Sequence, residues 1–359
     1  MGTILLTGSI AIADSEKINS LNEHNKTLPK ELINKEEHSA LQKKDEKAYL
    51  IPKNILDHLE FGFLMEAEGF YARSEQENES DLTLATVEFV ADATFSEGVS
   101  GHLGLLWEED DTEENILDEG FISFGATDSI PFYGRVGKMY LPFGNFESAF
   151  ISDPLTLEMA EINQSALLAG YENQWLNLCV GTFNGDFSED GREDTIDDWV
   201  ASISFTPSES VAFGAYFISD LLDTDGFEGF ATGLGTEYES ISGGGMFFNA
   251  NFGAVTFNAE CVSAMEEIKG LRPFSYNVEA SISFAEKWIA GIKIGGSNDF
   301  YTEYNAGSLE GKMPDWRSGM VISYELNDFV TFSGEYLHAE GLDHHSSSDT
   351  ITMQVAVGF

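Results

Sequence analysis

The chain has 359 residues, 62 of them acidic and 18 basic, and a formal net charge of −44 at neutral pH. This charge argues against nucleic acid as a partner, because phosphates are bound by Lys and Arg. A hydrophobic content of 42% argues against disorder over most of the length. No stretch reaches the 18 or more consecutive apolar residues of a transmembrane helix, a criterion that does not bear on membrane β-barrels.

Two N-terminal segments differ from the rest of the chain. Residues 1–13 end in Ala11-Ile12-Ala13 and resemble a signal peptide without its basic start, so we expect a truncated signal remnant, with a chance apolar terminus as the alternative. Residues 14–57 are polar and hold eight of the 18 basic residues. They predict a periplasmic arm that is disordered or partly helical, and a coiled-coil or oligomerisation segment is the alternative.

From residue 58 onwards, apolar and polar side chains alternate. In 59–71 the apolar residues alternate with Glu60, Glu66 and Glu68, and stretches of nine to twelve residues repeat the pattern up to Phe359. This is the length of a tilted strand that crosses a bilayer, whereas strands of soluble sandwiches average about five or six residues. Sixteen strands are predicted, near 58–72, 82–96, 99–108, 117–127, 131–141, 164–172, 174–184, 197–207, 209–219, 241–252, 253–264, 274–285, 287–298, 315–326, 328–339 and 348–359.

The connections between these strands alternate between brief turns and long loops, and aromatic residues lie near the strand ends. Both features are typical of bacterial outer-membrane barrels, which carry short periplasmic turns and longer extracellular loops. The sequence therefore predicts an all-β, transmembrane antiparallel β-barrel over 58–359, with about 16 strands and with 14 or 18 as alternatives. Outer-membrane lipid and lipopolysaccharide are the expected surroundings.

A barrel of sixteen strands leaves an aqueous channel, so passage of small solutes is the expected function. Outside the barrel, residues 14–57 are too short for the folded plug of an energised transporter. Alternation places acidic side chains in the lumen, which would favour cations. For the loops, a solvated acidic surface is the alternative. The lumenal acidic residues expected on strands are Glu60, Glu66, Glu68, Glu88, Asp92, Glu260, Glu279, Glu325 and Glu335.

One acidic loop has the spacing of a calcium loop. Its candidate ligands are Asp186, Ser188, Asp190, Asp194 and Asp197. Glu193 occupies a position that is usually hydrophobic, and no flanking helix pair is expected, so a solvated loop is the alternative. No other cofactor is expected.

Neither catalysis nor a disulfide is expected. The seven histidines fall in no recognisable nucleophile or zinc spacing. The two cysteines, Cys179 and Cys261, lie four strands apart on opposite faces of the predicted barrel, too far for a bridge.

The segment GKMYLPFGNFESAFISDPLTLEM, residues 137–159, interrupts the alternation. Pro142 removes a ladder donor and Gly144 permits a turn, so the fifth strand is expected to end here. We predict that residues 142–163 fold inward and narrow the lumen. Gly137-Lys138, Pro142-Phe143-Gly144, Phe146-Glu147-Ser148 and 151–158 resemble the LbtU family of siderophore porins. That resemblance implies import of a ferric siderophore without TonB coupling, and it supplies no assigned substrate residues.

Three functions remain open: a siderophore porin, a general cation-preferring diffusion porin, and a structural or adhesive barrel with little conductance. Ferric complexes of carboxylate siderophores are commonly anionic, which conflicts with a negative lumen. Strict alternation puts Arg135 and Lys138 on opposite faces, so one of them should be lumenal. A trimer is left open. Beyond the strand carboxylates, the candidate constriction and lumen residues are Arg135, Lys138, Glu147, Asp153, Glu158, Glu161 and Arg317.

Overall fold

The computed structural model describes residues 58–74, 78–109, 116–127, 130–185, 195–227, 240–267, 270–299, 313–341 and 347–359. The predicted signal remnant and arm, 1–13 and 14–57, lie outside these residues. The elements, in chain order, are β1 (Leu59–Ser74), β2 (Asn78–Ser96), β3 (Val99–Trp107), β4 (Leu117–Thr127), β5 (Ile130–Tyr140), α4 (Leu155–Ala160), β6 (Asn163–Glu172), β7 (Leu176–Phe183), β8 (Asp198–Ser208), β9 (Val211–Ile218), η1 (Leu221–Asp223), η2 (Asp225–Phe227), β10 (Gly243–Phe252), β11 (Val255–Ala264), β12 (Phe274–Phe284), β13 (Trp288–Asn298), β14 (Trp316–Asn327), β15 (Val330–Glu340) and β16 (Ser347–Gly358).

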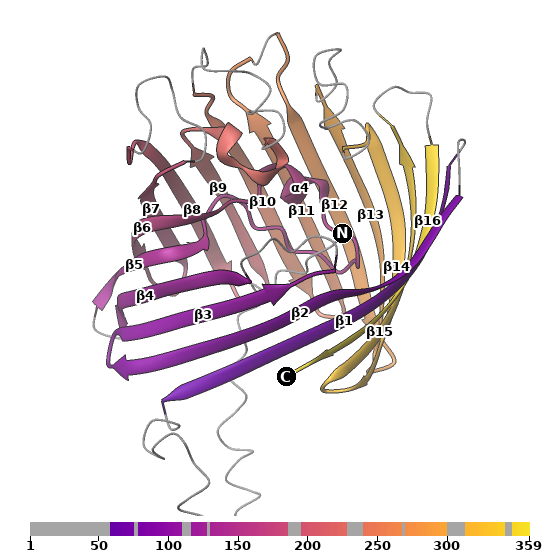
Figure 1. Ribbon diagram of the computed structural model, residues 1–359, viewed down its shortest axis with the longest axis horizontal. Coiled ribbons are helices and arrows are strands. Elements are labelled where there is room, and N and C mark those ends of the chain that lie inside the picture. Colours follow the sequence, from indigo (N-terminus) through magenta and orange to yellow (C-terminus); the bar gives the residue numbers. More distant parts are fainter. Residues whose placement is uncertain are drawn as a thin grey trace, which may run out of the picture. The chain divides into compact units, whose positions relative to one another are not determined.

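The sixteen strands form a closed antiparallel barrel (Figure 1). Each strand pairs with its neighbours in sequence, and β1 pairs with β16, with Met65 opposite Val357. The C-terminal Phe359 exchanges two backbone hydrogen bonds with Phe63, at N to O distances of 3.1 and 3.2 Å. Closure leaves no unpaired strand edge, which is what a bilayer demands of a β structure. The predicted fold class and the count of sixteen are confirmed.

The alternation in the sequence separates an outer apolar face from an inner polar face. On β13, Ile292 is 65% exposed and Ile294 47%, whereas Lys293 between them is 4% exposed. On β16, Met353 is exposed and the adjoining Gln354 is buried. Successive side chains of a strand point to opposite faces, so a period of two puts one chemistry outside and the other inside. An apolar outer band of this kind is suited to lipid.

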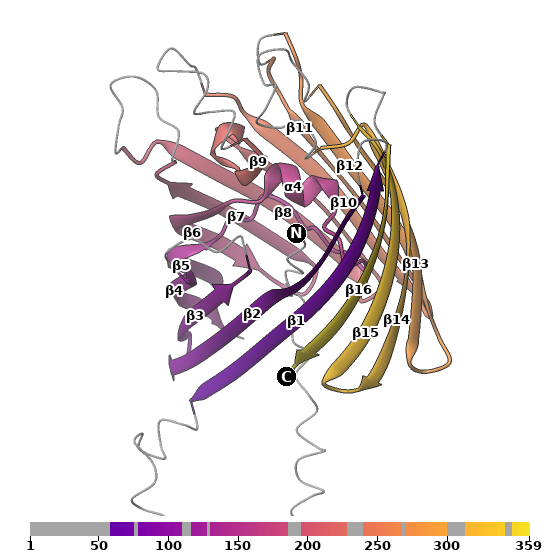
Figure 2. The ribbon, with the colours of Figure 1, turned by 45° about the vertical axis from the view of Figure 1, so that its right-hand side comes forward.

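From β2 onward, short and long connections alternate around the barrel. Two residues each join β8 to β9 (209–210), β10 to β11 (253–254) and β14 to β15 (328–329). The connections from β9 to β10 (219–242) and from β13 to β14 (299–315) are long. The turns that join β12 to β13 and β14 to β15 lie at the same end of the barrel as the C-terminus (Figure 2). No helix among the described residues is long and apolar enough to cross a membrane.

The two cysteines are free, as predicted. Cys179 on β7 is buried, between the outward-facing Leu178 and Val180, and Cys261 on β11 is half-buried. They therefore lie on opposite faces of the wall, and no disulfide joins them.

The interior is filled in part by the connection between β5 and β6, residues 141–162, which we call the inward segment. Its only helix, α4, packs against β11, β12 and β13 of the wall and against η2 (Figures 1 and 2). Phe143, Leu155 and Met159 of this segment are fully buried and belong to one apolar cluster with inner side chains of β5–β11. The segment therefore lies inside the barrel, as the break in alternation predicted.

Candidate pore constriction

The chain leaves β5 through a turn that only certain residues permit. Pro142 has no N–H to continue the ladder, and Gly144 follows with φ of 136°. A Cβ on Gly144 would meet the ring of Phe146 at 1.9 Å, so a side chain cannot be accommodated there. Phe143 points into the apolar cluster and makes an edge contact with Tyr216, with ring centroids 5.1 Å apart. The turn thus directs the chain toward the wall opposite β5.

Helix α4 is held by its apolar side. Leu155, Leu157 and Met159 are buried at 4% exposure or less. Glycines on the wall and on η2 allow the close approach, because a Cβ on Gly295 would contact Leu155 and a Cβ on Gly226 would lie 2.6 to 2.8 Å from backbone atoms of α4. Burial of three such side chains contributes about 1.5 to 3 kcal/mol each.

Three wall carboxylates accept hydrogen bonds from the backbone of the inward segment. Glu279 on β12 accepts from the Ala149 N–H at 3.1 Å and from the Ser148 hydroxyl at 2.8 Å. Glu335 on β15 accepts from the N–H groups of Ile151 and Ser152, at 2.7 and 3.1 Å. Each carboxylate therefore pairs with donors that a non-helical backbone leaves unsatisfied.

Glu260 on β11 accepts the most hydrogen bonds from the inward segment and the wall among these three carboxylates. One carboxylate oxygen accepts from the Asn145 N–H and from the Tyr216 hydroxyl, both at 2.7 Å. The other accepts from the Phe146 N–H at 2.9 Å and from the Thr156 hydroxyl at 3.2 Å. Four donors converge on two oxygens, so only an ionised carboxylate satisfies all of them.

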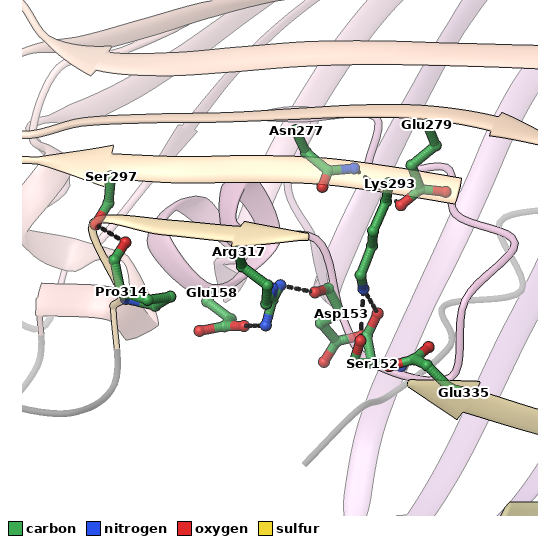
Figure 3. A network of polar contacts seen from close by, with 10 residues as sticks. All are labelled: Ser152, Asp153, Glu158, Asn277, Glu279, Lys293, Ser297, Pro314, Arg317 and Glu335. Atoms are coloured by element: carbon green, nitrogen blue, oxygen red, sulfur yellow. Dashed lines mark hydrogen bonds and ion pairs between the residues drawn. The ribbon is translucent and has the colours of Figure 1, made fainter. Parts of the chain in front are cut away.

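Two wall cations complete the attachment (Figure 3). Lys293 on β13 donates to the carbonyl oxygen and the hydroxyl of Ser152. Arg317 on β14 donates to the carbonyl of Asp153 and forms an ion pair with Glu158 at 3.0 Å. Both cations are nearly inaccessible, at 4% and 8% exposure. We call Glu260, Glu279, Glu335, Lys293 and Arg317 the wall anchors.

Phe150 fits into the same wall. Its ring lies against the inner surface at Gly291 and Gly319, where an added Cβ would approach it to 3.3 and 3.5 Å. The Lys293 ammonium is 4.5 Å from the ring centroid, within range of a cation–π contact. Phe150 is 2% exposed. The segment is thus attached by packing as well as by polar contacts.

These contacts assign structural roles to several residues that the sequence suggested as pore-lining charges. Glu279, Glu335 and Arg317 bind the inward segment, and Glu158 pairs with Arg317. Asp153 contributes its backbone carbonyl to Arg317. Their charge is therefore engaged with other protein groups.

Glu147 and Glu161 are the remaining acidic candidates of the inward segment. The Glu147 carbonyl accepts from Asn258, and burial raises the pKa of the Glu147 carboxyl. Burial, together with the charges of Asp225 and Asp153, raises the pKa of Glu161 to about 9. A carboxyl with that pKa is neutral at pH 7 and brings no negative charge to the segment.

Four acidic residues of β1 and β2 lie on the inner face of the wall: Glu66, Glu68, Glu88 and Asp92. Glu68 accepts from Gln354 of β16 at 2.9 Å, and Glu66 is buried. Asp92 contacts the Nδ1 atom of His102 at 2.9 Å, and the Nε2 atom of the same ring is 3.4 Å from Glu119. Glu88 lies on the same inner face of β2 and is half-buried. These residues line a part of the wall that carries none of the wall anchors.

Arg135 and Lys138 lie on opposite faces of the barrel wall. Arg135 is opposite Leu168, which is 3% exposed and points inward, whereas Lys138 is opposite the exposed Ser165. The register of β5 against β6 runs without a bulge through both positions. Arg135 is therefore lumenal and Lys138 lies on the outward-facing side, where its ammonium donates to the Leu117 carbonyl at 3.3 Å.

Most of the candidate calcium ligands, Asp186, Ser188, Asp190 and Asp194, lie outside the described residues. Asp197 is described and adjoins a different acidic group, Asp198, Asp220 and Asp223, whose carboxylate oxygens lie within 4.8 Å of one another. Asp220 also accepts from the N–H groups of Leu222 and Ile241, at 3.0 and 3.2 Å, so it caps η1.

The sequence places Glu260 in the lumen by alternation but does not assign it to the constriction, and Lys293 was missed altogether. The signal for Lys293 was present, because a lysine between two isoleucines of an alternating strand must point inward. Which side chain it meets depends on the path of the inward segment, and a local pattern does not encode that path.

Comparison with known proteins supports the fold and leaves the family open. Pseudomonas putida OprB superposes with a TM-score of 0.59 at 11% identity, over 85% of this chain and 96% of that one. An anion-selective porin from Comamonas acidovorans gives 0.58 at 10% identity, over 84% and 99%. Salmonella typhi OmpF, in complex with daunomycin, gives 0.58 at 9% identity, over 84% and 97%. At these identities the likeness shows the fold, which is that of outer-membrane porins.

Sequence relatives carry no functional name. A UPF0422 protein of Coxiella burnetii is 26% identical over 234 residues, 60% of this chain and 50% of the relative. A UPF0422 protein of Legionella pneumophila strain Lens is 26% identical over 184 residues, 48% of this chain and 34% of the relative. The chain thus matches half or less of the length of these relatives, and no protein-family model matches it. The closed barrel with its apolar outer band is an architecture of the bacterial outer membrane, where the chain is therefore located.

Proposed function

We propose that the chain is an outer-membrane diffusion porin, which lets small solutes pass without TonB coupling through a lumen narrowed by the inward segment. The observation that carries this proposal is the attachment of residues 141–162 across the inner wall of a sixteen-stranded barrel. A barrel of this size has room for an aqueous channel beside one internal segment. Five wall anchors fix the segment, and a fixed segment gives the channel a defined width.

Conductance tests this function directly. Purified protein in a planar lipid bilayer should give discrete, ohmic current steps in KCl. A folded barrel, verified by its slower unfolding in hot detergent, that inserts and carries no current would contradict the proposal. That result would favour the structural or adhesive barrel.

We propose a ferric siderophore as the specific solute, on the basis of the resemblance of 137–159 to the LbtU family. Uptake of iron-labelled siderophore should fall in a deletion strain and recover when the gene is restored. Unchanged uptake in a strain that lacks other siderophore receptors would rule out this role.

A general cation-preferring porin is the second candidate. The observation in its favour is the inward acidic group on β1 and β2, which includes Glu66, Glu68, Glu88 and Asp92. A reversal potential in a KCl gradient distinguishes it, because a cation-preferring pore moves toward the potassium equilibrium potential.

Two further properties belong to the proposal. Calcium binding at Asp186, Ser188, Asp190, Asp194 and Asp197 would give saturable heat in a calorimetric titration, beyond nonspecific screening. A trimer is proposed because a structural neighbour, OmpT of Vibrio cholerae, is described in a trimer form. Mass measured in native detergent complexes would distinguish a trimer from a monomer.

A further inference from the structure

The inner wall carries few basic side chains, and they are used unequally. Among the described strand residues that point inward, the lysines and arginines are Arg135, Lys293 and Arg317. Lys293 and Arg317 are buried beneath the inward segment and bind its backbone. Arg135, on β5, is exposed. A solute in the lumen therefore meets the charge of Arg135, while the other two are covered.

Two aromatic rings hold the Arg135 guanidinium in place. Its central carbon lies 5.6 Å from the centroid of Phe121 and 5.5 Å from that of Tyr133. Tyr133 is itself fixed, because its hydroxyl donates to Asn177 on β7 at 3.2 Å. Phe121 stacks with the His102 ring at 4.7 Å and 18°. The two rings that contact the guanidinium are therefore themselves fixed by contacts with Asn177 and His102.

The hydrogen-bonding edge of this guanidinium is open. The two ring contacts use no acceptor oxygen, so the five N–H donors of the guanidinium keep their capacity to bind one. Among the described residues, neither a carboxylate nor a carbonyl accepts a hydrogen bond from Arg135. Acidic groups lie on the neighbouring wall, but Asp92 and Glu119 are both engaged by His102.

We propose that Arg135 is a binding residue for solutes that carry a carboxylate, and that it determines which anions pass. This inference rests on the proposed porin function and names a solute class for it. A guanidinium presents two parallel N–H groups that match the two oxygens of a carboxylate. Prior fixation by Phe121 and Tyr133 lowers the entropy lost on binding. An anionic solute can thus be held in a lumen whose other exposed charges are mostly acidic.

The test is carried out on the purified full chain in planar bilayers. Citrate is added to one side, and both the block of potassium current and the reversal potential in a KCl gradient are measured. Arg135→Gln removes both the positive charge and the two parallel N–H donors of the guanidinium. Arg135→Lys keeps the positive charge and removes the paired donors. Lys287→Gln is the matched control, because Lys287 is exposed at the β12–β13 turn, where it donates to the Leu326 carbonyl.

We expect millimolar citrate to block the wild-type current. Arg135→Gln should weaken this block about tenfold and increase the preference for potassium over chloride. Arg135→Lys should keep the ion preference and lose most of the citrate block, and Lys287→Gln should match the wild type. An equal block by inorganic phosphate at the same charge would overturn the specificity for carboxylates.

The outcomes that overturn the inference are separate from failure of the porin function. If the wild type conducts and Arg135→Gln behaves like Lys287→Gln, Arg135 is not a binding residue and the porin function stands. If the folded wild type carries no current, the function and the inference fall together. Should Arg135→Gln fail to fold, Arg135→Lys decides the question. Loss of the citrate block in Arg135→Lys supports the inference, and retention of the block overturns it.

Discussion

Replacement of Glu260 by glutamine tests whether the inward segment is held by its wall anchors. The Glu260 carboxylate accepts hydrogen bonds from Asn145, Phe146, Thr156 and Tyr216. Glutamine has the same shape but presents one NH₂ group in place of an acceptor oxygen. The hydroxyls of Thr156 and Tyr216 can rotate away, whereas a backbone N–H cannot. One of the two backbone donors therefore faces another donor.

The magnitude follows from these bonds. A hydrogen bond to a charged acceptor contributes about 1.5 to 3 kcal/mol, and a buried donor left without a partner costs about 1 to 3 kcal/mol. We expect Glu260→Gln to weaken attachment of the segment by about 2 to 4 kcal/mol, because part of the loss is recovered by rotation of the hydroxyls. Each 1.4 kcal/mol is a factor of ten in an equilibrium constant. Amide exchange at Asn145 and Phe146 should therefore accelerate roughly 30- to 1,000-fold.

Hydrogen exchange with mass spectrometry over peptides that cover 141–162 is the assay. Glu325→Gln is the matched control, since Glu325 is an exposed acidic residue of β14 with the same change in charge. Strand amides of β11 report on the barrel itself and should keep their protection in both variants. If exchange at Asn145 and Phe146 is the same in Glu260→Gln and Glu325→Gln, the four-donor account of Glu260 is wrong.

Three further predictions address the turn, the cationic anchors and pH. Gly144→Ala should lower the free energy of unfolding, measured with a chemical denaturant, by about 1 to 3 kcal/mol. The φ angle of Gly144 is 136°, and the new Cβ would meet the Phe146 ring. Gly253→Ala is the control and should cost less, because Gly253 has φ of 69° and open space around its Cβ position. Lys293→Met should increase current noise, since Ser152 loses its cationic donor, whereas Lys287→Met should leave the noise unchanged. Glu161 binds its proton more tightly in the folded barrel, so its contribution to stability is complete below pH 4.5 and declines as the pH rises toward about 9. Glu161→Gln should flatten that decline in thermal unfolding, and an unchanged pH profile would show that Glu161 does not titrate as described.

The strands could be predicted from the sequence because a membrane barrel imposes a strong local rule. Each wall residue faces either lipid or lumen, so the apolar period of two is visible in every strand, as in 274–284 and 348–358. The break at Pro142 and Gly144 was visible for the same reason. β2 was predicted to begin near residue 82 and begins at Asn78, where polar residues hide the continuation of the strand.

The contacts of the inward segment could not be predicted in the same way. Glu279 joins Ala149 across 130 residues of chain, and Glu335 joins Ile151 across 184. Alternation gives the face of each wall residue but not its height in the barrel relative to the segment. Arg135 and Lys138 illustrate the same limit. Alternation required that they lie on opposite faces of the wall, and only the register of β5 with β6 showed which of them is lumenal.

The net charge is consequently a poor guide to what the lumen selects. Glu260, Glu279 and Glu335 are counted as acidic, yet Glu260 and Glu279 accept hydrogen bonds on both carboxylate oxygens and Glu335 accepts two on one oxygen. Lys293 and Arg317 lie beside the same segment. A carboxylate that already accepts several short hydrogen bonds attracts a passing cation less than a free one, because those donors stabilise its charge. Selectivity should instead follow from the charges that remain accessible. On the described wall these include Asp92, with half of its side chain exposed, and Arg135, which has no acidic partner among the described residues.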